Sequence, residues 1–192
     1  TLIQAVGKTK TESSKNLLLE AIHNSTDDRL AASAIKVLNN FDYNSVRSTV
    51  LDAVKNKSIT IASAALSYLE EYGRASDAAE YKNISRENLP WQVKLPLMGL
   101  ANKNFSYAYV IIKGNINSEL KSIFNRTDNL SEKTAALKAL AADPKNISFL
   151  LETGKNSQLP AMHSAVMDGV VSALKSKHFN IAFGGGGENI RK

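Results

Sequence analysis

The sequence predicts an all-α fold, arranged as an α-solenoid of about five to six helical hairpins. The pattern of residues 18–22 is repeated in residues 50–54, 32 positions later: both segments have two apolar residues, an acid, an alanine and a third apolar residue in the same order. Apolar residues also recur at helical spacing along most of the chain, and signals for β-strands are few. Because a fixed period of 20–50 residues is typical of solenoids, we expect a binding or supporting protein rather than an enzyme.

A second series of segments follows this period almost from end to end, at spacings of 32, 31, 31, 40 and 30 residues. In each segment the second and fifth residues are apolar, and the fourth is small in most copies. We call these the anchor segments: residues 2–6, 34–38, 65–69, 96–100, 136–140 and 166–170. Small residues allow two helices to approach toward the short end of the usual range of about 8–10 Å. Val37 and Tyr68, which are larger, predict looser contacts.

A second amphipathic helix is expected between consecutive anchors. Apolar residues at i, i+3, i+4 and i+7 indicate such helices, and three segments show this spacing: residues 14–24, 45–56 and 146–154. Each repeat is therefore predicted to be a helix, a turn and a helix. One such pair cannot bury its own apolar face, so neighbouring pairs must stack.

Capping residues predict where several helices begin. Either Asp27 or Asp28 suits the N-cap of a helix that starts near Arg29, and Ser131 suits the N-cap of a helix through residue 141. The pair Asp143-Pro144 is typical of an N-cap followed by proline at the first helical position, where a missing N–H costs nothing.

Glycine and proline predict where helices end. Gly7, Gly73 and Gly154 follow helical stretches and suit C-terminal caps. Pro96 falls inside an anchor segment, so it should end or kink that helix or force it to start near Leu95. Residues 107–112 could form a strand, but a helix fits better with the apolar residues that follow.

Composition favours one elongated repeat domain over residues 1–178, with residues 179–192 as a C-terminal tail or linker. The 192-residue chain is 43% apolar, carries a formal charge of +6 and has no cysteine, which excludes a disulfide framework and a thiolate zinc site. The run Gly184–Gly187 lacks the lysine and hydroxyl residue of a phosphate loop and is interpreted as a linker. The start at Thr1 and an uncapped first helix predict a fragment of a longer protein, with further repeats or a catalytic domain beside it.

Candidate catalytic residues are few. The three histidines, His23, His163 and His178, lie far apart in the sequence. His163 has no serine or carboxylate partner at helical spacing other than Ser164 and Asp168, which we expect to point elsewhere. His163 is interpreted as a solvated or capping residue. No metalloprotease, nucleophile-elbow or paired-carboxylate motif is present, so we expect no enzyme activity, no cofactor and no metal. Trp91 could stack on a ligand or anchor the packing between repeats.

A nucleic-acid-binding solenoid usually carries a basic stripe along one face. The middle residues of the anchor segments, which we expect to be exposed, form a mixed column: Gln4, Lys36, Ser67, Met98, Lys138 and Asp168. Further basic residues cluster in the centre of the chain: Lys94, Lys103, Lys113, Lys121 and Arg126. The modest surplus of positive charge makes phosphate binding the less favoured interpretation.

Residues 28–38 and 132–140 look like the second helix of a HEAT unit, and the similarity covers most of residues 1–175. The chain thus resembles HEAT/armadillo-like repeat proteins. A narrower similarity, on residues 89–94 and 133–144, is to the HEAT-repeat region of bacterial proteins that also carry a cyclophilin-type prolyl isomerase domain. That domain is a β-barrel with an arginine and aromatic site, and nothing here matches it. The resemblance implies a non-catalytic scaffold.

We therefore predict a protein-binding or scaffolding module that holds a protein or peptide in a concave groove. The candidate binding residues are Lys36, Trp91, Lys94 and Lys138. The alternative is a nucleic-acid-binding helical-repeat protein of the DNA glycosylase type, because such folds can cradle a duplex. No membrane span is expected, since no run of about 18 apolar residues occurs. An exported or periplasmic location is favoured over a cytoplasmic one, and the oligomeric state is not predicted.

Overall fold

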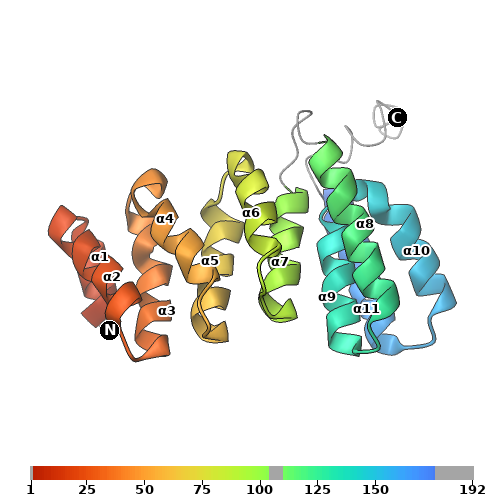
Figure 1. The fold of residues 1–192 in the computed structure, drawn as a ribbon, viewed down its shortest axis with the longest axis horizontal. Coiled ribbons are helices and arrows are strands. Elements are labelled where there is room, and N and C mark those ends of the chain that lie inside the picture. Colours follow the sequence, from red (N-terminus) through yellow and green to blue (C-terminus); the bar gives the residue numbers. More distant parts are fainter. Residues whose placement is uncertain (1, 104–109, 176–192) are drawn as a thin grey trace. The chain divides into compact units, whose positions relative to one another are not determined.

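The computed structural model describes residues 2–103 and 110–175, and these residues form helices with no β-strand (Figure 1). The α-helices are α1 (Leu2–Thr9), α2 (Glu12–Asn24), α3 (Asp28–Val37), α4 (Tyr43–Val54), α5 (Ile59–Tyr72), α6 (Ala78–Ser85), α7 (Trp91–Lys103), α8 (Val110–Arg126), α9 (Leu130–Ala141), α10 (Ile147–Asn156) and α11 (Pro160–Lys175). Short 3₁₀ turns occur at Leu38–Asn40, Ala75–Asp77 and Pro144–Asn146. The predicted all-α class is confirmed.

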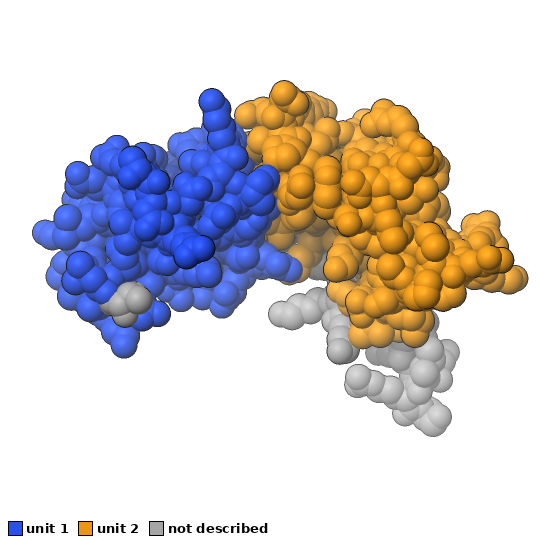
Figure 2. All heavy atoms as spheres, turned by 90° about the horizontal axis from the view of Figure 1, so that it is seen from below, with its two compact units in different colours: residues 1–74 blue, residues 75–192 orange. Residues whose placement is uncertain are grey.

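The chain divides into two compact units, residues 1–74 and 75–192, which Figure 2 colours separately. Unit 1 contains α1 to α5, and unit 2 contains α6 to α11. No helix in the described part of the chain is both long enough and apolar enough to cross a membrane. The predicted domain boundary at residue 178 and the glycine run lie outside the described residues.

Each unit is built from packed helical pairs. In unit 1, α2 packs on α3 and α4 packs on α5, while α1, α3 and α5 contact one another in sequence order. In unit 2 the pairs are α6 with α7, α8 with α9 and α10 with α11, and the stacked helices are α7, α9 and α11. Every anchor segment falls on one of these odd-numbered helices, with residue 38 in the 3₁₀ turn that continues α3. The period in the sequence therefore identified the helices that stack.

Small residues set the close approach between stacked helices in unit 2. A Cβ atom added to Gly99 of α7 would lie 3.2 Å from the Cα atom of Ala139 in α9. A Cβ on Gly169 of α11 would lie 2.9 Å from the Cβ of Ala141 in α9. Gly99, Ala139 and Gly169 are all fourth residues of anchor segments, as the sequence predicted, and a larger side chain at either glycine would force its neighbour in α9 to shift by a few tenths of an ångström or more.

Two of the three predicted glycine caps are wrong. Gly73 is the C-cap of α5, but Gly7 and Gly154 lie inside α1 and α10. Both make room for a valine of a neighbouring helix, Val37 of α3 and Val166 of α11, at 2.9 and 3.0 Å from the added Cβ. The contact at Val37 is accordingly tight rather than loose, because a glycine opposes the larger residue.

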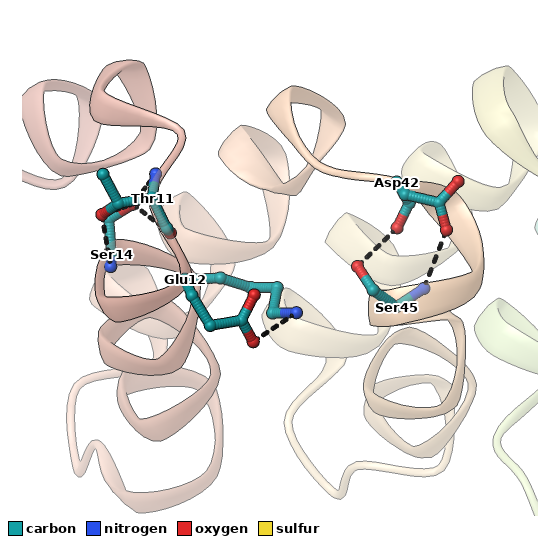
Figure 3. Close-up of polar contacts among 6 residues, drawn as sticks. Thr11, Glu12, Ser14, Asp42 and Ser45 are labelled. Carbon is teal, nitrogen blue, oxygen red and sulfur yellow. Dashed lines mark hydrogen bonds and ion pairs between the residues drawn. The ribbon is translucent and has the colours of Figure 1, made fainter.

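Side chains cap the starts of several helices, because the first backbone N–H groups of a helix have no acceptor within the helix. The hydroxyl of Thr11 accepts from the backbone N–H of Ser14, which completes a capping box at α2, and Asp42 accepts from Ser45 N–H at α4 (Figure 3). Of the two predicted candidates for α3, Asp27 is the cap, since its Oδ1 lies 2.8 Å from Arg29 N.

Two further capping predictions have different outcomes. Asp143 caps the turn that begins with Pro144, and it accepts from Lys145 N–H at 3.1 Å, as predicted. The prediction for Ser131 is wrong, because α9 begins at Leu130 and the side chain of Asn129 caps it. The helix starts two residues earlier than a cap at Ser131 would place it.

Pro96 neither ends α7 nor starts it, so that prediction is wrong for both boundaries. The helix begins at Trp91, and the N–H groups of Val93 and Lys94 donate to the carbonyl of Pro90. Pro96 has no N–H to donate to the carbonyl of Gln92, four residues earlier in the helix. Gln92 and Pro96 are both exposed, so water can bond to that carbonyl instead. Burial of the surrounding apolar residues maintains the helix.

The repeated pentapeptides have the predicted register. Leu18, Ile22, Val50 and Val54 are buried, and the acids Glu20 and Asp52 are exposed. Some apolar residues that the helical pattern suggested as core are exposed instead, namely Leu17 of α2 and Leu151 of α10. Met98 was expected in the exposed column but is buried, because α6, α8 and α9 all pack around α7. The helix predicted over residues 107–112 is confirmed from Val110 onward, and residues 107–109 lie outside the described range.

Tyrosine side chains gather where α4 meets α5 in unit 1. The rings of Tyr43 and Tyr68 stack with centroids 6.4 Å apart, and Tyr72 lies 4.9 Å from Tyr68. Arg74 lies over the Tyr43 ring at 5.1 Å. Burial, followed by the neighbouring Tyr72 and Asp42, raises the pKa of Tyr68 to about 12.

The buried repeat register predicts the effect of truncating Leu51. We expect Leu51→Ala to lower the free energy of unfolding by roughly 2–5 kcal/mol, because Leu51 is buried in α4. Leu19→Ala should cost less, since Leu19 is half-buried, and the exposed Leu17→Ala serves as the control at under about 0.5 kcal/mol. Urea unfolding would measure all three. A loss below about 0.5 kcal/mol for Leu51 would contradict the register.

The raised pKa of Tyr68 predicts a stability loss in alkali. Below pH 10 the phenol is protonated in both the folded and the unfolded chain; between pH 10 and 12 only the unfolded chain loses the proton. The free energy of unfolding should therefore fall by about 1 kcal/mol per pH unit in that window. Urea midpoints between pH 8 and 11.5 should show a shallower fall for Tyr68→Phe than for the wild type. Equal slopes would argue against this origin.

Candidate functional site

The four residues that the sequence suggested for binding are distributed over both units. Lys36 is exposed on α3 of unit 1, whereas Trp91 and Lys94 lie on α7 and Lys138 is exposed on α9, all in unit 2. Trp91 is the first residue of α7 and is half-buried. Across the described residues, no hydrogen bond, ion pair or ring contact joins any two of these four. Their role in binding stays a prediction.

Lys94 already has an anionic neighbour. Its Nζ lies 3.5 Å from Oε1 of Glu119 on α8. The same Glu119 acts on Lys82 of α6, whose pKa is lowered by burial and by the neighbouring Arg86 and is raised in part by this carboxylate. The positive charge at the start of unit 2 is therefore partly neutralised by Glu119.

A different part of unit 2 contains a groove of about 440 Å³ between the end of α8, α9, α10 and the segment that joins α10 to α11. Its lining combines apolar and polar side chains: Phe124, Asn125, Lys133, Phe149, Glu152, Thr153, Asn156, Ser157, Leu159 and Met162. We call this the α8–α10 groove.

The floor of the α8–α10 groove is the edge of the hydrophobic core. The buried cluster of α9, α10 and α11 includes Leu137, Leu150 and Met162, and Phe124 and Phe149 pack against it while remaining half-exposed. The two phenyl rings meet edge to face, with centroids 5.7 Å apart and planes at 82°. This is the favoured arrangement of an aromatic pair, so the rings form a defined apolar surface rather than a collapsed one.

Two lysines flank the phenyl pair. The Nζ of Lys121 lies 4.9 Å from the centre of the Phe149 ring, and the Nζ of Lys133 lies 5.8 Å from the centre of the Phe124 ring. These are cation–π distances, and neither ammonium pairs with a carboxylate in the described part of the chain. Glu152 contributes an exposed carboxylate to the groove lining. The phenyl pair therefore has positive charge beside it.

The wall formed by the α10–α11 connection is fixed by local hydrogen bonds. Ser157 Oγ accepts from Leu159 N–H at 3.2 Å, and Nε2 of His163 lies 2.6 Å from the Ser157 carbonyl oxygen. His163 is exposed on the first turn of α11. The predicted capping role fits this contact, which holds the connection against the next helix.

A buried polar cluster that the sequence analysis missed joins α7, α8 and the start of α10. Asn117 of α8 is its centre: its Oδ1 accepts from Asn102 Nδ2 and from Asn146 Nδ2, both at 2.8 Å. Its own Nδ2 donates to Asp143 Oδ2 at 2.9 Å. Asn102, Asp143 and Asn146 are all buried. We call these four residues the asparagine cluster.

The asparagine cluster also bonds to the backbone of α9. Asn102 Nδ2 donates to the Ala139 carbonyl at 3.2 Å, and Asn146 Nδ2 donates to the Leu140 carbonyl at 2.9 Å. The Oδ1 atom of Asn102 is buried and has no hydrogen-bond partner among the described residues. Because an unmade buried hydrogen bond is costly, the remaining bonds must hold the amide in place. Asparagines are common and follow no period in this sequence, so no local signal identified the cluster.

The side chains that line the α8–α10 groove determine what it can contact. The described residues contain no set of three or more histidine, aspartate or glutamate side chains placed to hold a metal ion. The groove lining combines phenyl rings, one methionine, one leucine, side-chain amides and opposite charges. Such a mixture is typical of a protein-recognition surface, where aromatic residues provide the anchor and polar residues form the rim.

No protein-family model, curated protein or solved structure matches this chain, so the geometry alone supports the interpretation of the site.

The asparagine cluster predicts that alanine substitutions of two asparagines on α8 lower the stability of the chain by different amounts. Asn117→Ala should lower the free energy of unfolding by roughly 2–4 kcal/mol, because it removes one hydrogen bond from each of three buried residues, Asn102, Asp143 and Asn146. Asn115→Ala, two residues earlier and exposed, is the matched control and should change it by less than about 0.5 kcal/mol. Thermal or urea unfolding compares the two. Equal effects would show that the cluster contributes nothing specific.

Proposed function

We propose that this chain is a non-catalytic, protein-binding helical-repeat module that holds a peptide segment in the α8–α10 groove. The observation that supports this most is the half-exposed phenyl pair of Phe124 and Phe149 at the edge of the core. Two ammonium groups lie over these rings, and neither pairs with a carboxylate among the described residues. Apolar surface of this kind is costly to leave in water, and its burial by a partner would be favourable.

The lining suggests which peptide would fit. An aliphatic or aromatic side chain would pack on the phenyl pair and on Met162 at the groove floor. A carboxylate next to it would approach Lys121 and Lys133, whose ammonium groups lie over the same rings. Asn125 and Asn156 would supply amide donors and acceptors for the peptide backbone. The expected ligand is therefore an apolar segment with adjacent acidic residues.

The architecture supports a scaffold of the α-solenoid type. In each unit the pairs are joined by stacking of odd-numbered helices, which is the packing that HEAT/armadillo-like repeats use. We infer that the chain belongs to a longer protein of this kind. The resemblance of residues 89–94 and 133–144 to the helical region beside a cyclophilin-type isomerase would make it the non-catalytic part.

Nucleic-acid binding has less support. Lys94 is paired with Glu119, and Lys121 and Lys133 lie over phenyl rings instead of forming a stripe of free cations. The middle column of the anchor segments contains Asp168, and its Met98 is buried. A duplex-binding face requires several aligned cations to displace counterions from phosphates.

Selection from a short random-peptide library displayed on phage tests the proposal. Peptides enriched on the wild-type chain should combine leucine or phenylalanine with aspartate or glutamate. The double variant Lys121→Glu/Lys133→Glu should weaken the enriched peptide by about tenfold or more in Kd, because it reverses both charges beside the rings. Fluorescence anisotropy with the labelled peptide provides the measurement.

The matched control is Lys36→Glu/Lys138→Glu, which makes the same change in net charge at two exposed lysines outside the groove lining. If the peptide binds in the α8–α10 groove, this control variant should bind it with a Kd within about twofold of the wild-type value. If the control weakens the peptide as much as the groove variant does, the binding is a general charge effect. If no peptide is enriched, the proposed function is wrong.

A further inference from the structure

The positive charge beside the α8–α10 groove is divided between two places. The ammonium group of Lys121, on α8, lies 4.9 Å from the centre of the Phe149 ring, and that of Lys133, on α9, lies 5.8 Å from the centre of the Phe124 ring. Both lysines are half-buried. Each ring of the phenyl pair therefore has its own cation, and an apolar side chain packed on the pair would have two separate positions near it where a carboxylate can meet an ammonium group.

The acidic side chains around the groove do not neutralise these two cations. Oε1 of Glu119 lies 3.5 Å from Nζ of Lys94, on α7. Oε2 of Glu132 accepts from the hydroxyl of Thr127 at 2.6 Å. Glu152 lines the groove and is exposed, but it forms no ion pair with a residue that the structure describes. The carboxylates that complete the two positions therefore have to come from the ligand.

The side-chain amides of the groove favour an extended ligand. Asn125 on α8 and Asn156 on α10 line the groove, are exposed and bond to no residue in the described part of the chain. A side-chain amide both donates and accepts, so each can bond to a peptide N–H or C=O. An extended peptide has these groups free, whereas a helix uses them in its own hydrogen bonds. In an extended segment alternate side chains lie on one face, about 6.5–7 Å apart.

We propose that the α8–α10 groove binds extended segments in which one bulky apolar residue has an acidic residue two positions before it and another two positions after it. The apolar side chain packs on the phenyl pair, one carboxylate pairs with Lys121 and the other pairs with Lys133. This inference rests on the proposed function, to which it adds the conformation of the ligand and the spacing of its two acids.

A short synthetic peptide with a central phenylalanine and an aspartate two positions away on either side tests the spacing. In fluorescence anisotropy with the wild-type chain, replacing either aspartate with asparagine should raise Kd by about three- to fivefold, and replacing both should multiply the two effects. A comparison peptide has its aspartates three positions away, where they share a face with the phenylalanine only in a helix. It should bind no more tightly than the peptide with two asparagines.

Two variants of the chain assign the acids to the lysines. Lys121→Gln should lose the preference for aspartate over asparagine at one of the two peptide positions, and Lys133→Gln should lose it at the other position. Lys138→Gln removes the same charge from an exposed position of α9 outside the groove lining, so it should keep both preferences. A general change in net charge would not produce such position-specific coupling. Far-UV circular dichroism would verify that all three variants remain folded.

The outcomes separate this inference from the proposed function. Equal binding of all the designed peptides, loss of the same preference in both lysine variants, or tighter binding of the helix-spaced peptide would each overturn the inference. Library-selected peptides that bind the wild type while the designed peptides do not would overturn it as well, and the proposed function would stand. If neither the designed peptides nor any library peptide binds, the proposed function fails and this inference fails with it.

Discussion

The close approach of stacked helices is the constraint on which unit 2 depends. Gly99 allows α7 to lie against the backbone of α9 at Ala139, and Gly169 allows α11 to lie against Ala141 on the same helix. At that separation, the side chain of Asn102 reaches the Ala139 carbonyl across the interface. Apolar packing alone would permit the helices to slide, whereas a buried amide bonded to a particular carbonyl selects one register.

The same constraint positions the α8–α10 groove. Asn117 ties α8 to the asparagine cluster, and Phe124 lies seven residues later, two turns along the same face of that helix. Asn146 and Asp143 fix the start of α10, and Phe149 follows Asn146 by three residues. The asparagine cluster thus fixes α8 and the start of α10 relative to each other. The contact between Phe124 and Phe149 at the surface follows from that placement.

The sequence predicted what is periodic or local. The anchor segments, the buried register of Leu18 and Val50, and the caps Asp27 and Asp143 all follow from spacing within a few turns. Gly7 and Gly154 were misassigned because a glycine at a helix crossing and a glycine cap look alike in sequence. The asparagine cluster and the groove were not predicted, since each joins residues of separate helices and neither repeats. Pro96 continued its helix because burial of its neighbours outweighed one lost hydrogen bond.

A designed cross-link between α7 and α9 tests the central claim most directly. The chain has no cysteine, and a Cβ on Gly99 would lie 3.4 Å from the Cβ of Ala139, close to the separation of about 3.5–4.5 Å that a disulfide joins. Gly99→Cys with Ala139→Cys should therefore form an intramolecular disulfide on mild oxidation, detected by mass spectrometry under denaturing conditions. The control pair, Gly99→Cys with the exposed Lys138→Cys, should remain reduced. Oxidation of the control as readily as the test pair, or none in either, would contradict this stacking register.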